Sequence, residues 1–234
     1  MKPINKAIIG VVAALALSVV SSQAQLISLN FSSSFPGSTS SIQFNGAAHT
    51  FQFNASNSGE QWQIGSETGG TGSAINLFGG VFNGPFSYGP ITTAGAVQYA
   101  TVAAPPYGAL SINDGLGDYL TGNVDWLQVE TTFSIGGINA ALLVNVTGLA
   151  YSGANADLNS LVTDGASGGS MNLSFQFSPA MTLTDLSTGT GPYTTSYSGS
   201  ISAGSVPEPS SVAFILMGMG ALVCSWRLKH SGNA

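Results

Sequence analysis

Short runs of alternating apolar and polar residues, broken by glycine-rich turns, constrain the fold of this chain more than any other feature. Residues 171–177 (MNLSFQF) alternate without a fault, as in a strand with one buried face. Segments such as 69–72 (GGTG) and 113–115 (NDG) lie between such runs and favour turns. The pattern predicts an all-β fold, a single antiparallel domain of β-sandwich or jelly-roll type. The other expected strands cover 26–31, 41–45, 49–53, 61–64, 96–102, 124–133, 141–146 and 193–201.

Three glycine-containing segments and one helical segment complete this assignment. Residues 78–80 (FGG) and 121–123 (TGN) are interpreted as turns, and 187–192 as a loop within the domain. Residues 155–162 show a helical rhythm, but the segment is too short to change the fold class.

The charge distribution excludes some classes of partner. Only 6% of the residues are charged, against about 25% in an ordinary globular protein. All ten acidic residues except Glu208 lie in 25–205, and this stretch contains no Lys or Arg. A nucleic-acid-binding surface needs basic side chains against the phosphates, so nucleic acid is excluded as a partner of this stretch. The basic residues of the chain are Lys2, Lys6, Arg227 and Lys229.

The N-terminus has the three parts of a secretory signal peptide. Lys2 and Lys6 precede the apolar run 7–20, and Ser22 and Ala24 supply small residues before a cut at Gln25. We therefore expect a signal peptide over 1–24 and an exported domain over 25–205. The single cysteine, Cys224, lies beyond that domain, so no disulfide is expected within it.

The C-terminal tail, 206–234, is organised as a membrane segment. Pro207 and Pro209 favour an extended backbone, so we expect a helix to begin only after them. Residues 211–226 are almost entirely apolar and predict a transmembrane helix. The basic end 227–234 then predicts a single-pass precursor in the inner membrane, with the N-terminus outside and the C-terminus in the cytoplasm.

The tail also carries a family resemblance. Residues 206–210, with Pro207, Glu208 and Pro209, then the apolar segment, then Arg227, Lys229 and His230, resemble the PEP-CTERM sorting signal of Gram-negative bacteria that make extracellular polysaccharide. The resemblance implies that an exosortase recognises Pro207, Glu208 and Pro209 and cuts nearby. It further implies delivery of the released domain to the cell surface or the exopolysaccharide matrix.

Candidate catalytic and metal sites in the exported domain are weak. Residues 165–169 (GASGG) match the nucleophile-elbow pattern around Ser167, but the only histidine downstream is His230, in the tail. His49 is the only other histidine, so a zinc site with several histidine ligands cannot be assembled. We expect no cofactor and no enzymatic activity. The carboxylates that a glycoside hydrolase would have to pair are Glu60, Glu67, Asp118, Asp125 and Glu130.

One segment is a candidate calcium site. Asn113, Asp114 and Asp118 place an amide and two carboxylates within six residues, although the spacing differs from a calcium-binding loop. A hairpin turn built on Asp114 and Gly115 is the favoured interpretation.

Aromatic residues offer a second class of function, carbohydrate binding. Trp62 and Trp126 are candidates for stacking on sugar rings, together with Tyr88, Tyr107 and Tyr119. Both tryptophans fall in strand-like segments, where a core position is favoured.

These observations lead to one main hypothesis and two alternatives. The main hypothesis is an exported, non-enzymatic structural protein of the cell surface or extracellular matrix. The first alternative is a surface polysaccharide-binding module, and the second is a calcium-binding adhesin or a glycoside hydrolase.

Overall fold

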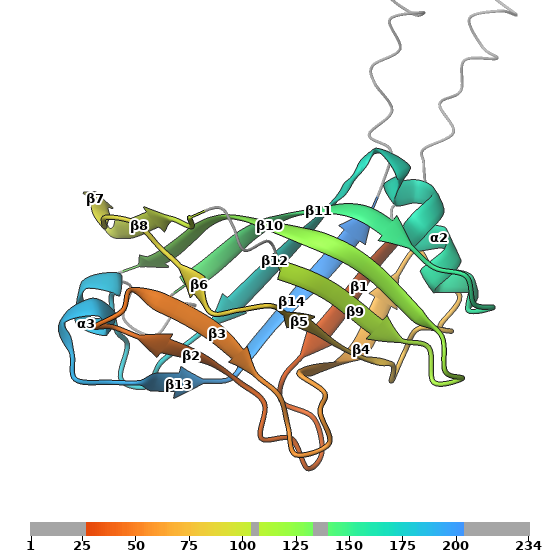
Figure 1. Cartoon of the computed structure of the whole chain (residues 1–234), viewed down its shortest axis with the longest axis horizontal. Coiled ribbons are helices and arrows are strands. Elements are labelled where there is room, and N and C mark those ends of the chain that lie inside the picture. Colours follow the sequence, from red (N-terminus) through yellow and green to blue (C-terminus); the bar gives the residue numbers. More distant parts are fainter. Residues whose placement is uncertain (1–26, 104–107, 133–139, 204–234) are drawn as a thin grey trace, which may run out of the picture. The chain divides into compact units, whose positions relative to one another are not determined.

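A computed structural model describes residues 27–103, 108–132 and 140–203, and its main element is a closed antiparallel barrel (Figure 1). Eight strands form the barrel, and pairing of β10 with β11 closes it. An interior of this size is filled by side chains. In spatial order the barrel strands are β11 (Ala140–Ala150), β12 (Gly169–Phe175), β14 (Tyr197–Ala203), β1 (Ile27–Ser32), β4 (Trp62–Thr68), β5 (Phe78–Phe82), β9 (Gly108–Asn113) and β10 (Tyr119–Thr132).

The longest strand, β10, makes closure possible. Its first half pairs with β9 and its second half with β8 (Val97–Thr101), while its other edge pairs with β11 along most of its length. The β10–β11 register shifts between Thr121 and Asn123 and again between Trp126 and Gln128. Such irregularities bend and twist a strand, which lets the sheet curl onto itself. The short strand β7 (Thr92–Ala94) continues the sheet beyond β8.

A second, smaller sheet shares the core of the barrel. It contains β13 (Tyr193–Thr195), β2 (Ser41–Asn45), β3 (Thr50–Asn54) and β6 (Phe86–Ser87). Phe51 and Phe53 on β3 lie 5.4 and 5.5 Å from the ring of Trp126 on β10. Phe44 on β2 lies 5.0 Å from Phe175 on β12. The two sheets therefore enclose one continuous aromatic core, which the helix α3 (Leu183–Thr188) extends through buried Leu183 and Leu186.

One helix, α2 (Ala156–Asp164), packs beside the barrel end at which β1 begins and β14 ends (Figure 1). Its buried Leu158 and Leu161 belong to the core, and the side chain of Asn155 caps its N-terminus. The 3-10 turn η1 (Gly165–Ser167) then leads into β12.

The structure corrects several sequence-based predictions. The structure is mostly β, but the predicted β-sandwich or jelly roll is wrong, because β10 joins β9 and β8 to β11 and closes a barrel. The turns expected at 78–80 and 121–123 lie inside β5 and β10. The strand expected at 193–201 is divided between the two sheets as β13 and β14. The helix at 155–162 is confirmed by α2, whereas α3 was not predicted.

The predicted signal peptide (1–24) and transmembrane helix (211–226) both lie outside the described residues. Within the part of the chain that the structure describes, no helix has the length and apolar character needed to cross a membrane.

Candidate functional site

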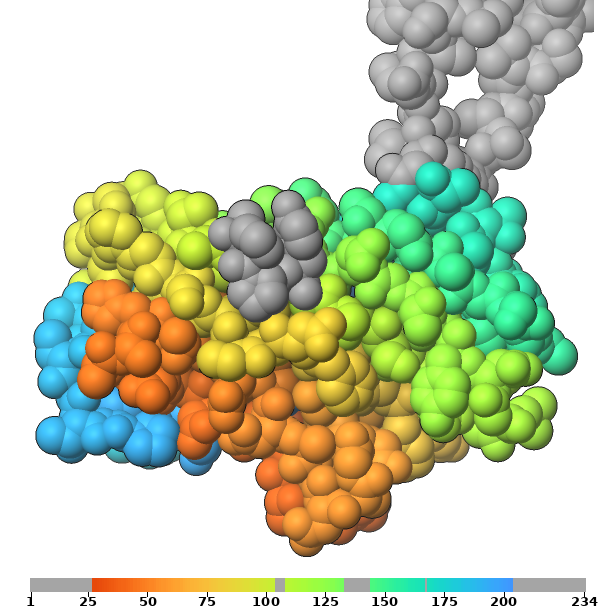
Figure 2. Space-filling model, viewed as in Figure 1, coloured from red at the N-terminus to blue at the C-terminus, as the bar shows by residue number. Residues whose placement is uncertain are grey.

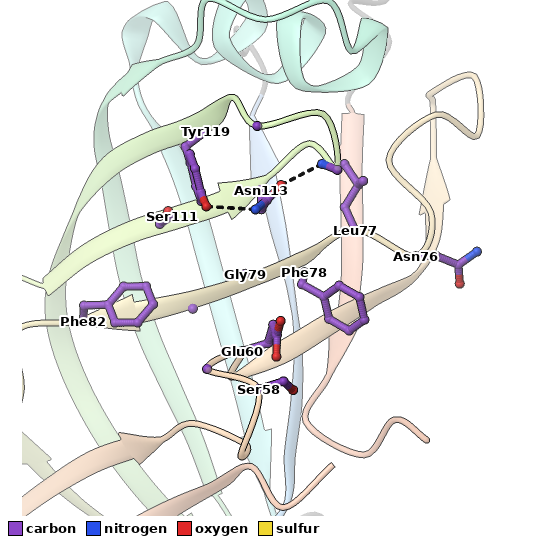
Figure 3. A pocket seen from close by; sticks show the side chains of 14 residues that line it. Ser58, Glu60, Asn76, Leu77, Phe78, Gly79, Phe82, Ser111, Asn113 and Tyr119 are labelled. Atoms are coloured by element: carbon purple, nitrogen blue, oxygen red, sulfur yellow. Dashed lines mark hydrogen bonds between the residues drawn. The ribbon is translucent and has the colours of Figure 1, made fainter. Parts of the chain in front are cut away.

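A cleft of about 580 Å³ lies on the outer face of β5, β9 and β10 and is the candidate functional site (Figures 2 and 3). This volume falls in the range of ordinary ligand sites. In Figure 2 the orange lobe, which contains the turn after β3, and the green lobe, which contains the β9–β10 hairpin, stand on two sides of it. The residues that line the cleft are Ser58, Gly59, Glu60, Asn76, Leu77, Phe78, Gly79, Gly80, Phe82, Ser111, Asn113, Gly115, Gly117 and Tyr119.

Strand β5 supplies two aromatic rings on either side of a glycine. Because side chains alternate along a strand, Phe78, Gly80 and Phe82 share the outer face. A Cβ atom on Gly80 would lie 2.8 Å from the Phe82 ring and 3.0 Å from the buried Gln61 side chain, so the glycine lets the Phe82 ring lie close against the strand. Gly79 faces inward, where it contacts the Trp62 indole. The Phe82 side chain is 40% exposed.

The neighbouring strands continue this face with polar groups. Phe78 pairs with Asn113 on β9, and Asn113 pairs with Tyr119 on β10. The Asn113 side-chain Nδ2 donates to the Tyr119 hydroxyl at 3.0 Å, and its Oδ1 accepts from the Gly115 N–H at 2.7 Å (Figure 3). Tyr119 is 52% exposed. A ligand on this face would therefore meet aromatic faces beside fixed amide and hydroxyl groups.

The Asp114 carboxylate holds the hairpin wall of the cleft. Its Oδ1 accepts from the N–H groups of Leu116, Gly117 and Asp118 at 2.7 to 3.0 Å, and its Oδ2 accepts from the Tyr151 hydroxyl at 2.8 Å. Burial raises the pKa of Asp114, but the hydrogen bonds from Leu116 and Tyr151 outweigh it, and the pKa lies below its usual value. The loop presents Gly115 and Gly117 to the cleft as a result.

The hydrogen bonds of Asp114 concern the calcium site that the sequence offered as a candidate at Asn113, Asp114 and Asp118. The hairpin between β9 and β10 is confirmed, and four protein donors already occupy the Asp114 carboxylate. Asp118 contributes its backbone N–H to that carboxylate. Within residues 27–103, 108–132 and 140–203, no group of three or more His, Cys, Asp or Glu side chains gathers as metal ligands would.

A second carboxylate, Asp157, holds the segment that leads to Asn76 and Leu77. It is 1% exposed and accepts from the N–H groups of Thr71 and Ser73 at 2.7 and 2.6 Å, and from the Ser73 hydroxyl at 2.7 Å. Burial raises the pKa of Asp157, but the hydrogen bonds from Ser73 and Thr71 outweigh it and lower the pKa to about 2. A carboxylate with several N–H donors is expected to behave in this way.

Tyr151 and Asn155 join the two carboxylates into one network. The Tyr151 hydroxyl donates to Asp114 and accepts from the Asn155 N–H at 2.9 Å. The Asn155 side chain donates to the Ser73 carbonyl at 2.8 Å and accepts from the Asp157 N–H at 3.1 Å. Two walls of the cleft are therefore connected through the N-terminus of α2.

Glu60 lines the opposite side of the cleft, on the turn between β3 and β4. The Ser56 N–H donates to the Glu60 carbonyl at 2.7 Å, and the Ser56 hydroxyl donates to the Glu60 Oε2 at 3.3 Å. A hydrogen bond from the Ser58 hydroxyl is the main cause of a pKa below the usual value for Glu60. The cleft therefore carries a negative charge at neutral pH.

The sequence-predicted stacking residues fall into three groups. Trp62 and Trp126 are buried in the core at 1% and 8% exposure, as favoured for tryptophans in strand-like segments, so they do not serve as exposed stacking faces. Tyr88 is also buried, and Tyr107 lies outside the described residues. Tyr119 lines the cleft.

Phe78 and Phe82 were missed because the glycines beside them were interpreted as a turn. The signal that could have found them is the alternation of Phe78, Gly80 and Phe82 along one strand face. Glycine inside a strand often marks a close approach of another group, and this is its role at Gly79.

The remaining predicted sites are not brought together. Ser167 lies in η1 between α2 and β12, whereas a nucleophile elbow lies between a strand and a following helix. The His49 ring stacks on Tyr88 with the centroids 5.3 Å apart. Of the carboxylates considered for glycoside hydrolysis, Glu60 lines the cleft, while Glu67 lies beside Asp157, at the end of β4.

The comparisons with known proteins identify the tail. A model of the PEP-CTERM protein-sorting motif matches residues 205–229, which include Pro207, Glu208, Pro209, Arg227 and Lys229, while His230 follows directly. These residues lie outside the described part of the chain. Neither the curated proteins nor the solved structures give a match. The chain thus carries a PEP-CTERM protein-sorting motif, which marks an exported protein that an exosortase sorts to the cell surface.

Proposed function

We propose that the domain over 25–205 is a non-enzymatic protein of the cell surface or extracellular matrix that binds polysaccharide in the cleft. The observation that carries this proposal is the outer face of β5, where Phe78 and Phe82 line the cleft on either side of Gly80, with Tyr119 two strands away. Strand geometry places the Cα atoms of Phe78 and Phe82 about 13 Å apart and those of Phe78 and Tyr119 about 10 Å apart. An extended sugar chain is long enough to contact all three rings.

The chemistry of the lining suits a sugar. Aromatic faces pack against the apolar faces of sugar rings, while the Asn113 amide and the Ser111 hydroxyl offer hydrogen bonds to sugar hydroxyls. The network through Asp114 and Asp157 holds the walls before a ligand arrives, which reduces the entropy lost on binding.

A binding role fits the lining better than hydrolysis. Glycoside hydrolases pair two carboxyl groups across the scissile bond, and the lining residues include one, Glu60. Asp114 and Asp157 are committed to backbone N–H donors. We therefore assign the cleft to binding without turnover.

The sorting motif supplies the destination in this proposal. We propose that the exosortase recognises Pro207, Glu208 and Pro209 and cuts nearby, so that the mature domain reaches the polysaccharide matrix. Replacing the three residues with alanine should leave a heavier, uncut protein in the cell. An unchanged mass and location of this variant would contradict the proposed cut.

Binding is tested with mature protein purified from host culture and a panel of neutral oligosaccharides, measured by calorimetry. Phe82→Ala and Tyr119→Ala should each weaken binding by about 5- to 10-fold, because each removes one stacking face. Leu127→Ala is the matched control, since Leu127 is 45% exposed on β10 but does not line the cleft. Binding that is absent from wild type, or equal in all four proteins, would overturn the proposal.

A further inference from the structure

We infer that the cleft selects uncharged glycan segments over acidic ones and that Glu60 sets this selection. The inference rests on the proposed glycan binding and adds the class of sugar. Three observations support it: Glu60 lies in the cleft, hydrogen bonds fix its carboxylate, and the domain has no Lys or Arg to balance its charge.

The Glu60 carboxylate lies where a bound chain would pass. Figure 3 shows its side chain between Phe78 and Phe82, beside the floor of the cleft. A sugar that spans the two rings would therefore place its substituents near this carboxylate. Any acidic substituent would meet a like charge there.

The protein fixes Glu60 in this place. Its backbone carbonyl accepts from the Ser56 N–H at 2.7 Å and from the Ser40 hydroxyl at 2.9 Å. The Gly59 N–H donates to the Ser56 carbonyl at 3.0 Å and closes the turn. The carboxylate accepts from the Ser56 hydroxyl, so the side chain is held as well as the backbone.

No basic side chain of the domain offsets this charge, because residues 25–205 contain neither Lys nor Arg. The Ser58 hydrogen bond favours the ionised form, so the carboxylate remains charged at neutral pH. An acidic glycan such as a polyuronate would thus enter a cleft that lacks a counter-charge. A neutral glycan meets hydrogen-bond partners and aromatic faces without this repulsion.

Two like charges about 6 Å apart repel strongly enough to produce about 3- to 100-fold discrimination, for an effective dielectric between 80 and 20. Because the site is open to solvent, salt screens part of this repulsion, and the discrimination should decrease with ionic strength. The sign of the effect also reverses for a cationic sugar. An amine-bearing chain should bind at least as well as the neutral chain.

The test compares three chains with one backbone, one neutral, one bearing carboxylates and one bearing amines, on mature protein purified from host culture. Wild type should bind the neutral and amine-bearing chains and discriminate against the acidic chain at low salt. In Glu60→Gln the affinity for the acidic chain relative to that for the neutral chain should rise at least about 5-fold. Asp125→Asn is the matched control, because it removes the same charge from a β10 position that does not line the cleft.

The outcomes separate this inference from the proposed function. Equal binding of acidic and neutral chains by wild type, or an unchanged ratio in Glu60→Gln, would overturn the selection by Glu60 and leave glycan binding intact. A selectivity change of the same size in Asp125→Asn would also overturn it, since the effect would then come from net charge. Failure of wild type to bind any of the three chains would overturn both the inference and the proposed function.

Discussion

Two outer faces of the same barrel differ in how their side chains are arranged. On β12, β14, β1 and β4 the outward residues are uncharged polar side chains, and some of them hydrogen-bond across the strands. We call this face the hydroxyl wall. On β5, β9 and β10 the outward positions carry aromatic rings around a glycine, and loops rise on either side. The residues of the hydroxyl wall are Ser28, Asn30, Ser32, Gln63, Ser66, Thr68, Ser170, Asn172, Ser174, Ser198, Ser200 and Ser202.

Three hydrogen bonds link side chains of the hydroxyl wall across neighbouring strands. Asn172 donates to Ser200 at 3.0 Å, Ser202 to Ser28 at 3.0 Å, and Asn30 to Ser66 at 3.2 Å. Continuous strand pairing holds its backbone.

The cleft face depends instead on a few groups, among them the buried Asp114 and Asp157 and the half-buried Tyr151. The stability of the hydroxyl wall is therefore spread over several weak contacts, whereas the cleft face relies on single residues. Substitutions should therefore have unequal effects on the two faces.

The largest difference is expected for Gly79→Val. The new side chain would meet the Trp62 indole, and its Cβ would lie 2.7 Å from the Ser111 carbonyl oxygen, so the core and β9 would have to move. We expect a loss of about 3 kcal/mol in the free energy of unfolding. Ser200→Val on the hydroxyl wall should change it by less than about 0.5 kcal/mol. Urea unfolding of both variants checks this, and equal effects would remove the contrast between the faces.

Asp157→Asn should have the next largest effect. The folded pKa of about 2 lies below the usual value of 3.8, so ionised Asp157 stabilises the fold above pH 3.8, and this stabilisation disappears as the pH falls from 3.8 towards 2. The variant should lose about 2 kcal/mol at pH 7 and show a flatter dependence of stability on acid. Unfolding curves at several pH values test this. Parallel pH profiles for wild type and variant would contradict it.

Tyr151→Phe should have a smaller effect of about 1 to 2 kcal/mol, because it removes one hydroxyl that bridges Asp114 and Asn155. Asn30→Ala, which removes an exposed hydrogen bond of the hydroxyl wall, should cost less than about 0.5 kcal/mol. Hydrogen exchange at Leu116 and Gly117 should quicken in Tyr151→Phe. Unchanged exchange there would show that the network does not hold this wall.

Glu67→Gln should have the smallest effect, and unlike the other substitutions it should stabilise the fold at pH 7. Burial is the main cause that raises the pKa of Glu67, and the neighbouring Asp157 carboxylate raises it further, so the ionised form is disfavoured in the folded state. Wild type should therefore lose some stability as the pH rises through and above 4.5, whereas Glu67→Gln should not. Thermal unfolding at pH 4 and pH 7 compares the two proteins. A variant that is less stable than wild type at pH 7 would contradict this account.

The local features of the fold could be predicted from the sequence, but its closure could not. Alternation over 171–177 identifies β12, and Asn155 marks the start of α2 as its N-cap. Closure depends on which strands pair with β10 and on two register shifts within it, and these are non-local properties. A glycine in the sequence was also ambiguous, because it can mark either a turn or a position of close packing. Gly122 lies inside β10, where a Cβ atom would lie 2.9 Å from the Leu149 side chain, so it marks close packing and not a turn.

The candidate site was only partly visible in the sequence. Tyr119 could be proposed because a tyrosine ring offers a flat face for stacking on sugars, but Phe78 and Phe82 required the knowledge that 78–82 is a strand. Burial of Trp62 depends on Gly79 lying against it from the next strand, which no local pattern reveals.

Pairing of the first and last strands of the barrel gives folding a temporal order. Ile27 at the start of β1 pairs with Ala203 at the end of β14, and β14 also pairs with β12. The barrel therefore cannot be completed until residue 203 has left the export machinery, shortly before the sorting motif that begins at residue 205. Such long-range pairing is slow to form. The last strand of the barrel therefore becomes available for pairing just before the sorting motif becomes available to the exosortase.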